Sequence, residues 1–509
     1  MRRTLFPRTA TDPHALALDD GARTRTWAGL EDRVARFANG LRDDLGLAAD
    51  DAIAVLMHNR EEGIEAVLAG IAAGVWVTPI NWHLAPAEVE YVARDCGAKA
   101  VFADVAHADV ARRALAGTGA RVLVAGDELD AWLDAASDAP PSLDGPAGGN
   151  MIYTSGTTGR PKGVKRARPP QLGAALDAQA AYARRIGLDG GGPHLVTGPL
   201  YHSSPLMMAI YEMQTGAPAI VMPRWDERAF LEIVDEREVR HSHLVPTMFV
   251  RLLRLPDDVR ARSRRPALDR VLHGAAPISP ATKRAMIDWW GPILTEYWGG
   301  TEGGVQTLIH ADDWLAHPGS VGRALPMFEI WAADDDGRRL PPGEVGTLFA
   351  RDERHAQPFA YHGDPAKTAE AIPAPHVFTL GDMGSVDADG YVFLADRKSN
   401  MIISGGVNIY PAEIEQVLVA HPAVADVAVF GVPDDEWGES VKAAVELAPG
   451  FAPSPDLERE IVAFAAERLA RYKLPRSVDF ERELPRHPSG KLYVRRLKER
   501  YWAGRDERI

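Results

Sequence analysis

The chain has almost no cysteine and no excess of positive charge. Cys96 is the only cysteine among 509 residues, so an intrachain disulfide and a cysteine-rich metal site are excluded. A reducing compartment, the cytoplasm, is the expected location. The formal net charge is -14 at pH 7. Because nucleic-acid binding needs a basic face to neutralise phosphates, no nucleic-acid partner is expected, although a local cationic cluster could still bind a small anion.

Long apolar runs are also lacking. The most apolar stretch, residues 66–80, is shorter than the ~20 residues that span a bilayer, and Gly70, Gly74 and Pro79 interrupt it. It predicts a buried helix that leads into a core strand, so no transmembrane segment is expected. The start Met1-Arg2-Arg3 has no apolar run behind it, which argues against a secretory signal. Peripheral membrane contact stays open.

The length and patterning predict an α/β protein of two or more domains. Hydrophobic residues make up 46% and charged residues 25%, a balance typical of globular proteins. Strand-like apolar runs alternate with amphipathic helical patterns, which favours largely parallel sheets. The clearest runs are residues 52–56, 100–102, 122–124, 219–222 and 271–273.

Shorter elements follow residue 396 and predict a second, smaller domain. We expect a helix over 412–421, a strand over 427–432 and a helix over 457–472, whose apolar residues fall on one stripe. These elements indicate an α+β module of about a hundred residues, within the usual size range of a domain.

The strongest local signal is a loop of small residues after an apolar strand, in residues 151–164. Hydroxyl donors, glycines that admit a ligand close to the backbone, and one lysine together suit a triphosphate. The pattern is not a P-loop, because the Gly-Lys-Ser/Thr ending is absent. The alternative is a flexible surface turn. The candidate phosphate-binding residues are Thr154, Ser155, Gly156, Thr157, Thr158, Gly159, Lys162 and Gly163.

This loop, Tyr153-Thr-Ser-Gly-Thr-Thr-Gly-Arg-Pro-Lys-Gly163, resembles the phosphate loop of the adenylate-forming superfamily. That superfamily includes acyl-CoA synthetases, peptide-synthetase adenylation domains and luciferases. Further segments resemble its motifs in the same order along most of the chain: 199–202, 245–248, 274–277, 296–302, 381–382, 396–397, 403–413 and 485–491. Within the superfamily, the chain resembles the acyl-CoA synthetase branch.

The resemblance implies a fold and a domain division. We expect a large N-terminal domain over 1–396, made of stacked α/β subdomains with a small β-barrel-like part. A hinge would lie at 397–400. A small mobile α+β domain would follow at 401–509.

The resemblance also implies an ATP-dependent acyl-CoA ligase that uses Mg²⁺, ATP and coenzyme A. A carboxylic acid would become an acyl-adenylate with release of pyrophosphate, and CoA would then take the acyl group. Two alternatives are an enzyme that loads an acyl or aryl acid onto a carrier protein, and a nucleotide-binding protein without turnover. No carrier domain is evident, which favours free CoA. The joint presence of Thr158, Lys162, Glu302, Asp382, Arg397 and Lys491 argues against lost catalysis. A homodimer stays open.

The resemblance assigns roles around the nucleotide. Glu302 would bind Mg²⁺, since hard carboxylate oxygens suit that ion, with Thr154 and Thr301 near phosphate or metal-bound water. Trp298, at a position usually occupied by tyrosine, would stack on adenine. Asp382 and Arg397 would contact ribose. Without the family resemblance, Glu302 would be interpreted as a glutamate at a helix start and Trp298 as a core residue. Asp382 and Arg397 would be interpreted as surface ion-pair residues. Other expected nucleotide contacts are Gly274, Ala275, Ala276, Pro277, Glu296, Tyr297, Gly299 and Gly300.

Lys491 is the leading catalytic residue that the resemblance implies. Its ammonium would bridge the attacking carboxylate and the α-phosphate. The small domain would then rotate about Lys398 and Ser399 to admit the CoA thiol. The usual pivot residue is Asp or Lys, and here it is Ser399. The pantetheine channel would be lined by Ser404, Gly405 and Gly406.

The acyl pocket is expected to be mostly apolar. His202 would gate the pocket or contact the carboxylate, and no cationic residue stands out as a reader of a second carboxylate. A fatty, alicyclic or steroid side-chain acid therefore fits better than a small polar one. His241 and His243 could suggest a metal, but a structural role is favoured because no third ligand is evident. The expected pocket residues are His202, Pro205, Leu206, Met207, Ile210, Val245, Met248, Gly303 and Gly304.

Overall fold

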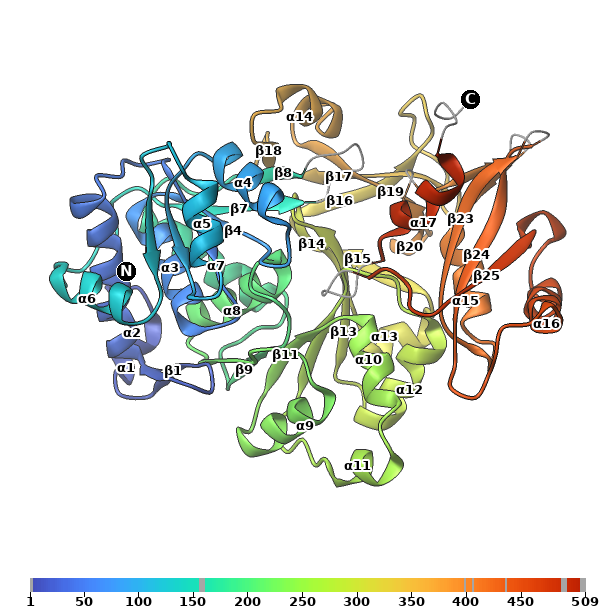
Figure 1. The fold of residues 1–509 in the computed structure, drawn as a ribbon, viewed down its shortest axis with the longest axis horizontal. Coiled ribbons are helices and arrows are strands. Elements are labelled where there is room, and N and C mark those ends of the chain that lie inside the picture. The colour runs from blue at the N-terminus through green and yellow to red at the C-terminus, as the bar shows by residue number, and fades with distance from the viewer. Residues whose placement is uncertain are drawn as a thin grey trace. The chain divides into compact units, whose positions relative to one another are not determined.

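Two mostly parallel sheets organise the first of two units in the chain (Figure 1). The computed structural model describes residues 3–154, 161–397, 400–404, 407–434, 437–486 and 492–503. Unit 1 comprises residues 1–275, 284–315 and 352–378, and unit 2 comprises 276–283, 316–351 and 379–509.

The first sheet of unit 1 has the strand order β18-β8-β7-β4-β3-β5-β6. Its centre, from β7 to β6, is parallel, whereas β8 runs antiparallel to both β7 and β18. The strands are β3 Ala52–Leu56, β4 Trp76–Pro79, β5 Ala98–Ala103, β6 Arg121–Val124, β7 Gly149–Thr154, β8 Lys162–Arg166 and β18 Phe359–Tyr361.

The second sheet contributes the strand order β14-β13-β12-β11-β9-β10-β1-β2 to unit 1. It is parallel from β13 to β1 and antiparallel at both ends. The strands are β1 Leu16–Asp19, β2 Thr24–Thr26, β9 His194–Val196, β10 Ala219–Val221, β11 His241–Leu244, β12 Arg270–His273, β13 Leu294–Gly300 and β14 Gly304–His310.

Helix α3, Glu61–Ala73, lies in the middle of the unit 1 core and is buried on every face. It ends at Gly74, whose φ of 86° is left-handed, a conformation that glycine adopts without strain. The other helices before residue 380 are α1 Pro7–Thr11, α2 Trp27–Asn39, α4 Pro86–Asp95, α5 Ala108–Ala114, α6 Asp127–Ala135, α7 Leu172–Arg185, α8 Ser203–Thr215, α9 Glu227–Glu236, α10 Pro246–Leu253, α11 Asp257–Arg262, α12 Pro280–Trp290, α13 Ala311–Ala316 and α14 Pro365–Ala371, with a π-helical turn at Gly40–Asp44.

Unit 2 contains two open sheets among its described residues. One has the order β16-β17-β19-β20-β15, and the other has the order β22-β21-β24-β23 with β25 paired to β24. The expected barrel-like part is thus an open sheet here. The strands are β15 Ser320–Ala324, β16 Phe328–Ala333, β17 Gly346–Asp352, β19 Val377–Val386, β20 Tyr391–Arg397, β21 Ile402–Ser404, β22 Val407–Ile409, β23 Val424–Asp434, β24 Gly438–Leu447 and β25 Ser477–Glu481.

The helices of the C-terminal sheet are α15 Pro411–Leu418, α16 Pro455–Ala466 and α17 Val494–Trp502, with a 3₁₀ turn at Arg471–Lys473. An apolar core that includes Ile414, Val429 and Ile461 holds α15 and α16 on the strands. Helix α16 begins where the Ser454 hydroxyl accepts a bond from the Leu457 N–H at 3.1 Å, an N-cap that fixes its start.

The predicted elements are largely confirmed. The five strand-like runs correspond to β3, β5, β6, β10 and β12, and residues 66–80 form the end of α3 and then β4. The helix predicted over 457–472 is shorter, because it ends at Ala466 and a 3₁₀ turn follows. In the part of the chain that the structure describes, no helix is both long and apolar enough to cross a bilayer.

Helix α8 is anchored to β11 by a buried contact between Glu212 and His241. The His241 Nδ1–H donates to Glu212, and His194 Nδ1 lies 3.7 Å from the same carboxylate. Burial alone would raise the pKa of Glu212, but the nearby His194 and the hydrogen bond from His241 outweigh it and lower the pKa to about 2. Because the pKa is depressed, ionised Glu212 stabilises the fold at pH values above the ordinary glutamate pKa of about 4.3. This stabilisation is lost as the pH falls towards 2.

Glu212→Gln is therefore expected to lower the free energy of unfolding at pH 7 by about 3 kcal/mol, because it removes the buried carboxylate that faces both His194 and His241. Urea unfolding at pH 7 and at pH 3 measures the effect, which should shrink at the lower pH. Glu232→Gln, on the exposed face of α9, is the control. An equal loss at both pH values would contradict the pair's role.

Candidate active site

The two ends of the predicted phosphate loop lie side by side. Strands β7 and β8 are antiparallel, and Thr154 stands opposite Lys162 in their register. The Lys162 ammonium is 3.2 Å from the Asp364 carboxylate at the start of α14. Ser155, Gly156, Thr157, Thr158 and Gly159 lie outside the described residues. The described flanks place a hydroxyl and a cation at the same end of the sheet.

Glu302 is held by a tyrosine from a distant segment. The Tyr361 hydroxyl donates to Glu302 Oε1 at 2.9 Å. Tyr361 ends β18, which pairs with β8 and sets Tyr361 opposite Val164. Glu302 is partly exposed, so its carboxylate can still receive a hard cation, and its oxygen donors fit Mg²⁺.

Strand β13 presents the predicted adenine segment. Trp298 is 5% exposed, and its main-chain N–H donates to Thr307 Oγ1 at 3.2 Å. Stacking of Trp298 on adenine stays a prediction. A Cβ at Gly299 would lie 1.9 Å from the Gly304 carbonyl oxygen, so only glycine fits this close approach between β13 and β14. Glu296 is also buried, and Gly300 and Thr301 are partly exposed.

Tyr297 faces the predicted acyl wall. Its hydroxyl donates to Ser204 Oγ at 2.8 Å and lies 2.8 Å from His243 Nε2. Burial raises the pKa of Tyr297 to about 12, and burial with the neighbouring His194 lowers the pKa of His243 to about 3. Both groups are therefore neutral near pH 7. They join β13 and β11 to the first turn of α8.

The predicted acyl-wall residues come together around this junction. Pro205, Leu206 and Ile210 are buried on α8, whereas Met207 is partly exposed. The Asn150 amide donates to Met207 Sδ at 3.0 Å. His202 is the residue before α8, and Val245 is the residue before α10. Met248 Sδ accepts from the Thr197 hydroxyl at 3.7 Å, and the same hydroxyl donates to the His243 carbonyl oxygen at 2.6 Å.

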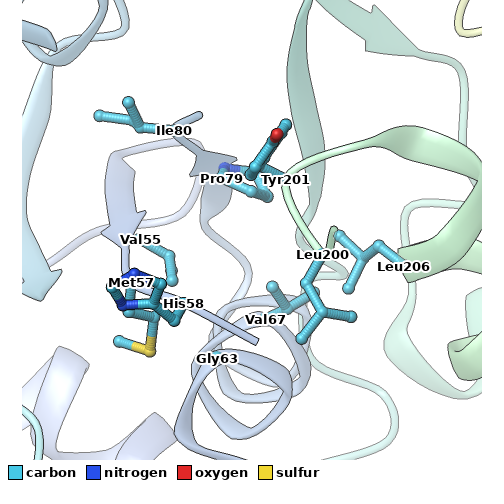
Figure 2. A pocket seen from close by; sticks show the side chains of 10 residues that line it. All are labelled: Val55, Met57, His58, Gly63, Val67, Pro79, Ile80, Leu200, Tyr201 and Leu206. Carbon is cyan, nitrogen blue, oxygen red and sulfur yellow. The ribbon is translucent and has the colours of Figure 1, made fainter. Parts of the chain in front are cut away.

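A small apolar pocket lies behind this wall (Figure 2). Leu200 and Leu206 line one side of it, so Leu206 contributes to this pocket as well as to the predicted wall. The other lining residues are Val55, Met57, His58, Gly63, Val67, Pro79, Ile80 and Tyr201.

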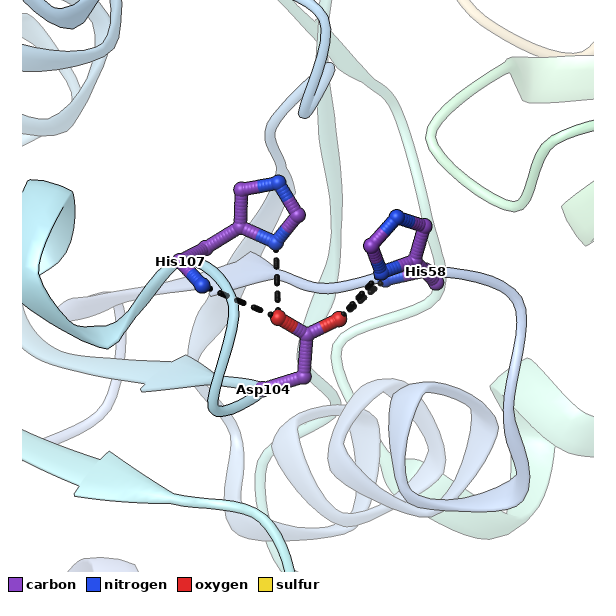
Figure 3. A group of neighbouring side chains, drawn as sticks. All are labelled: His58, Asp104 and His107. Atoms are coloured by element: carbon purple, nitrogen blue, oxygen red, sulfur yellow. Dashed lines mark hydrogen bonds and ion pairs between the residues drawn. The ribbon is translucent and has the colours of Figure 1, made fainter.

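His58, Asp104 and His107 form a cluster that the sequence did not reveal (Figure 3). The rings of His58 and His107 each lie 2.6 Å from a different oxygen of Asp104, and their main-chain N–H groups donate to the same oxygens at 2.9 and 3.1 Å. Burial alone would raise the pKa of Asp104, but these hydrogen bonds lower it. Because Asp104 is already saturated by N–H groups, we assign it a structural role at the start of α5.

The histidines of β11 have structural partners. His241 binds Glu212, and His243 binds Tyr297. Among the described residues, the only potential metal-ligand group is the His58 cluster. These contacts support the structural role expected for His241 and His243.

In unit 2, Asp382 lies on β19 directly opposite Arg397 of β20 and is 9% exposed. Asp396 accepts from the Ala412 N–H at 3.0 Å and from the Asn400 side chain at 3.1 Å, so the start of the predicted hinge is tied to α15. Ser404 ends β21. Lys398, Ser399, Gly405, Gly406 and Lys491 lie outside the described residues.

The predicted adenine-side motif divides between the units. Gly274 and Ala275 belong to unit 1, and Ala276 and Pro277 belong to unit 2. A Cβ at Gly274 would lie 2.6 Å from the Tyr297 carbonyl oxygen, and Ala275 has a left-handed φ of 64°. Such strain in a non-glycine residue is frequent at ligand sites.

Glu415 on α15 makes the free energy of unfolding of unit 2 depend on pH. Burial raises its pKa to about 8, although the Val429 N–H donates to its Oε1 at 2.8 Å; the nearby Asp396 also raises it. A raised carboxyl pKa means that the folded state holds the proton more tightly. The contribution of Glu415 to stability is therefore greatest at pH values below the ordinary glutamate pKa of about 4.3, and it is lost as the pH rises towards 8.

Glu415→Gln keeps an acceptor for Val429 and removes the charge. It is expected to raise the free energy of unfolding at pH 8 by about 1 kcal/mol, with less gain at pH 5. Urea unfolding across this range measures it. Glu458→Gln is the matched control, since Glu458 also accepts a main-chain N–H, from Val478 at 2.9 Å. A gain that is independent of pH would contradict the assignment.

Comparison with known proteins agrees with this architecture. Residues 5–357 match the AMP-binding enzyme family, and residues 413–491 match the AMP-binding enzyme C-terminal domain. The chain is 34% identical to a feruloyl-CoA synthase of an Amycolatopsis species over 97% of both chains. It is 33% identical to the fatty acid–[acyl-carrier-protein] ligase ScoC of Streptomyces coeruleorubidus, covering 94% of this chain and 92% of that one.

Among solved structures, ATP-bound MatB from Rhodopseudomonas palustris superposes with a TM-score of 0.86 at 28% identity, covering 99% of both chains. The family match extends over more than half of the sequence and includes the strand pair with Thr154 and Lys162, as well as Glu302. The protein therefore belongs to the AMP-binding enzyme family, the adenylate-forming enzymes, with a large N-terminal part and a smaller C-terminal domain.

Proposed function

We propose that the protein is an AMP-forming acyl-CoA ligase. It converts a carboxylic acid and ATP into an acyl-adenylate and pyrophosphate, and then transfers the acyl group to CoA with release of AMP. The observation that carries the proposal is the arrangement of Thr154 opposite Lys162 on β7 and β8, with β18 linking the same strand to Glu302 through Tyr361.

The chemistry explains this set of residues. A carboxylate is a poor electrophile and must first displace pyrophosphate from the α-phosphorus, so two anions have to meet. Lys162 and the Thr154 hydroxyl supply charge and hydrogen bonds where negative charge accumulates on phosphate oxygens. Glu302 would hold Mg²⁺, which neutralises phosphate charge when bound. Asp382 would accept the ribose hydroxyls, and Arg397 would contact ribose or phosphate.

The mobile part supplies the remaining roles. Lys491 would bring its ammonium to the carboxylate and the α-phosphate during adenylation. Rotation about Lys398 and Ser399 would then remove it and open the channel beside Ser404, Gly405 and Gly406 to the CoA thiol. The expected substrates are fatty, alicyclic or steroid side-chain acids whose apolar part packs against the wall made by α8.

Loading of a carrier protein is the second candidate, because a relative at 33% identity is named as a fatty acid–[acyl-carrier-protein] ligase. Acid-dependent ATP–pyrophosphate exchange over a panel of fatty, aromatic, dicarboxylic and steroid side-chain acids tests adenylation. Acyl transfer to CoA and to a phosphopantetheinylated carrier then separates the two acceptors. Exchange without transfer to CoA would exclude the ligase, and no exchange with any acid would exclude both.

A further inference from the structure

Arg166 is a cation deep in unit 1 that the proposed mechanism does not use. It is the last residue of β8, four positions after Lys162, and lies among Tyr182, Tyr211 and the more distant Asp352. It remains partly exposed.

The guanidinium lacks a carboxylate partner among the described residues. Its acceptors are neutral: the Tyr211 hydroxyl, which hydrogen-bonds to the guanidinium, and the Gly303 carbonyl oxygen, at the long distance of 3.5 Å. Asp352 is itself engaged by Arg354 at 2.8 Å. Two neighbouring cations do have carboxylate partners, because Lys162 on β8 binds Asp364 at 3.2 Å and Arg168, just after β8, binds Asp50 at 2.9 Å. Among the described residues, no carboxylate thus neutralises Arg166, and its guanidinium has five N–H donors for these two neutral acceptors and for a ligand.

Arg166 contacts two glycines that the sequence predicts to line the acyl pocket, Gly303 and Gly304. A Cβ at Gly304 would lie 2.8 and 2.9 Å from the two terminal guanidinium nitrogens and 3.0 Å from the Tyr182 hydroxyl. Gly304 has a left-handed φ of 71° and is partly exposed. The Tyr182 hydroxyl fixes the next residue, since it accepts from the Val305 N–H at 2.8 Å and donates to the Val305 oxygen at 2.9 Å. The bare backbone of Gly303 and Gly304 therefore borders the guanidinium.

A second polar group nearby also lacks partners. Gln306 is fully buried, and neither atom of its carboxamide has a hydrogen-bond partner among the described residues. Its nitrogen would lie 2.4 Å from a Cβ placed on Gly303. Buried amides are almost always bonded, so an unbonded amide at Gly303, with an unneutralised guanidinium at Gly304, supports a place where a ligand supplies the missing acceptors.

We propose that Arg166 reads the far end of the acid, and that the preferred substrates carry a second carboxylate there. This inference rests on the proposed function and replaces the wholly apolar pocket expected from the sequence. A carboxylate matches the guanidinium fork with two parallel hydrogen bonds. It also neutralises a buried charge that a methyl end would leave unpaired.

Matched pairs of monocarboxylic and α,ω-dicarboxylic acids of equal chain length test this. The measured quantity is kcat/KM for acid-dependent AMP formation. The wild-type enzyme is expected to favour the diacid of the fitting length. Arg166→Leu should reduce that preference by about 10- to 100-fold, largely through KM, and should preserve or improve turnover of the monoacid. Arg166→Lys should retain part of the preference. Arg168→Gln, on the same side of the chain and outside the pocket, should leave the ratio unchanged.

The outcomes separate the inference from the proposed function. An unchanged diacid-to-monoacid ratio in Arg166→Leu, with AMP still formed, would overturn the role of Arg166 and leave the ligase intact. No AMP from the wild-type enzyme with any acid would instead overturn the ligase. Urea unfolding tests whether Arg166 instead stabilises the fold. If its charge is buried and unpaired, its removal should preserve or raise the unfolding midpoint. A lower midpoint for Arg166→Leu would identify a structural arginine and would also overturn the inference.

Discussion

Replacing Lys491 with alanine is expected to slow acyl-adenylate formation by about 10²–10³-fold, the cost of removing one charged donor from a developing anion. Thioester formation from a supplied acyl-adenylate should be nearly unchanged. The reason is that only the first half-reaction brings two anions together at the α-phosphate. In the second, a thiol attacks an activated carbonyl, and the lysine would already have left the site.

The two half-reactions are measured separately. ATP–pyrophosphate exchange reports adenylation, and conversion of synthetic acyl-adenylate with CoA reports transfer. Lys498→Ala, on helix α17 of the same basic C-terminal segment, is the control and should leave both rates intact. Equal losses in the two half-reactions for Lys491→Ala would refute the division of labour between the two positions of the small domain.

Glu302→Gln is expected to lower adenylation by about 10²-fold, an effect comparable to the loss of one preorganised polar group at a transferring phosphate. Glutamine keeps an oxygen that can accept from the Tyr361 hydroxyl but loses the charge that attracts Mg²⁺. The Mg²⁺ concentration for half-maximal exchange should therefore rise, and saturating Mg²⁺ should restore part of the rate.

Tyr361→Phe separates orientation from charge at the same carboxylate. It removes one hydrogen bond of 2.9 Å and leaves the carboxylate in place, so the expected loss is only about 5-fold, the equivalent of roughly 1 kcal/mol. Glu344→Gln, at an exposed position, serves as the control. If Glu302→Gln and wild-type enzyme had the same Mg²⁺ dependence, Glu302 would not be the metal ligand.

The sequence predicted those features that depend on neighbours along the chain. Apolar runs of strand length located β3 and β12 to within one residue, and the glycine- and hydroxyl-rich loop after β7 pointed to the AMP-binding enzyme family that the comparisons show. Element ends were less accurate where long-range pairing decides them. Strand β23 extends over Val424–Asp434, beyond the predicted 427–432, because β24 pairs with it along its length.

The residues that were missed reach the site through distant pairings. Tyr361 approaches Glu302 because β18 joins β8, although nearly two hundred residues separate these strands in the chain. Arg166 looks like one more basic residue in the run 165–168, and only the packing of Tyr182 and Gly304 reveals that it points inward. His58 and Asp104 are likewise brought together by β3 and β5. No local pattern carries this information.

Helix α8, the proposed acyl wall, leaves a limited set of positions at which substrate preference would diverge. Glu212, Pro205 and Ile210 hold the helix in the core, so changes there would cost folding before they altered selectivity. Ser204 and Met207 are partly exposed on the same helix and can be exchanged with less damage. Natural variants with new acid preferences should therefore differ first at these two positions, while the buried face of the helix stays constant.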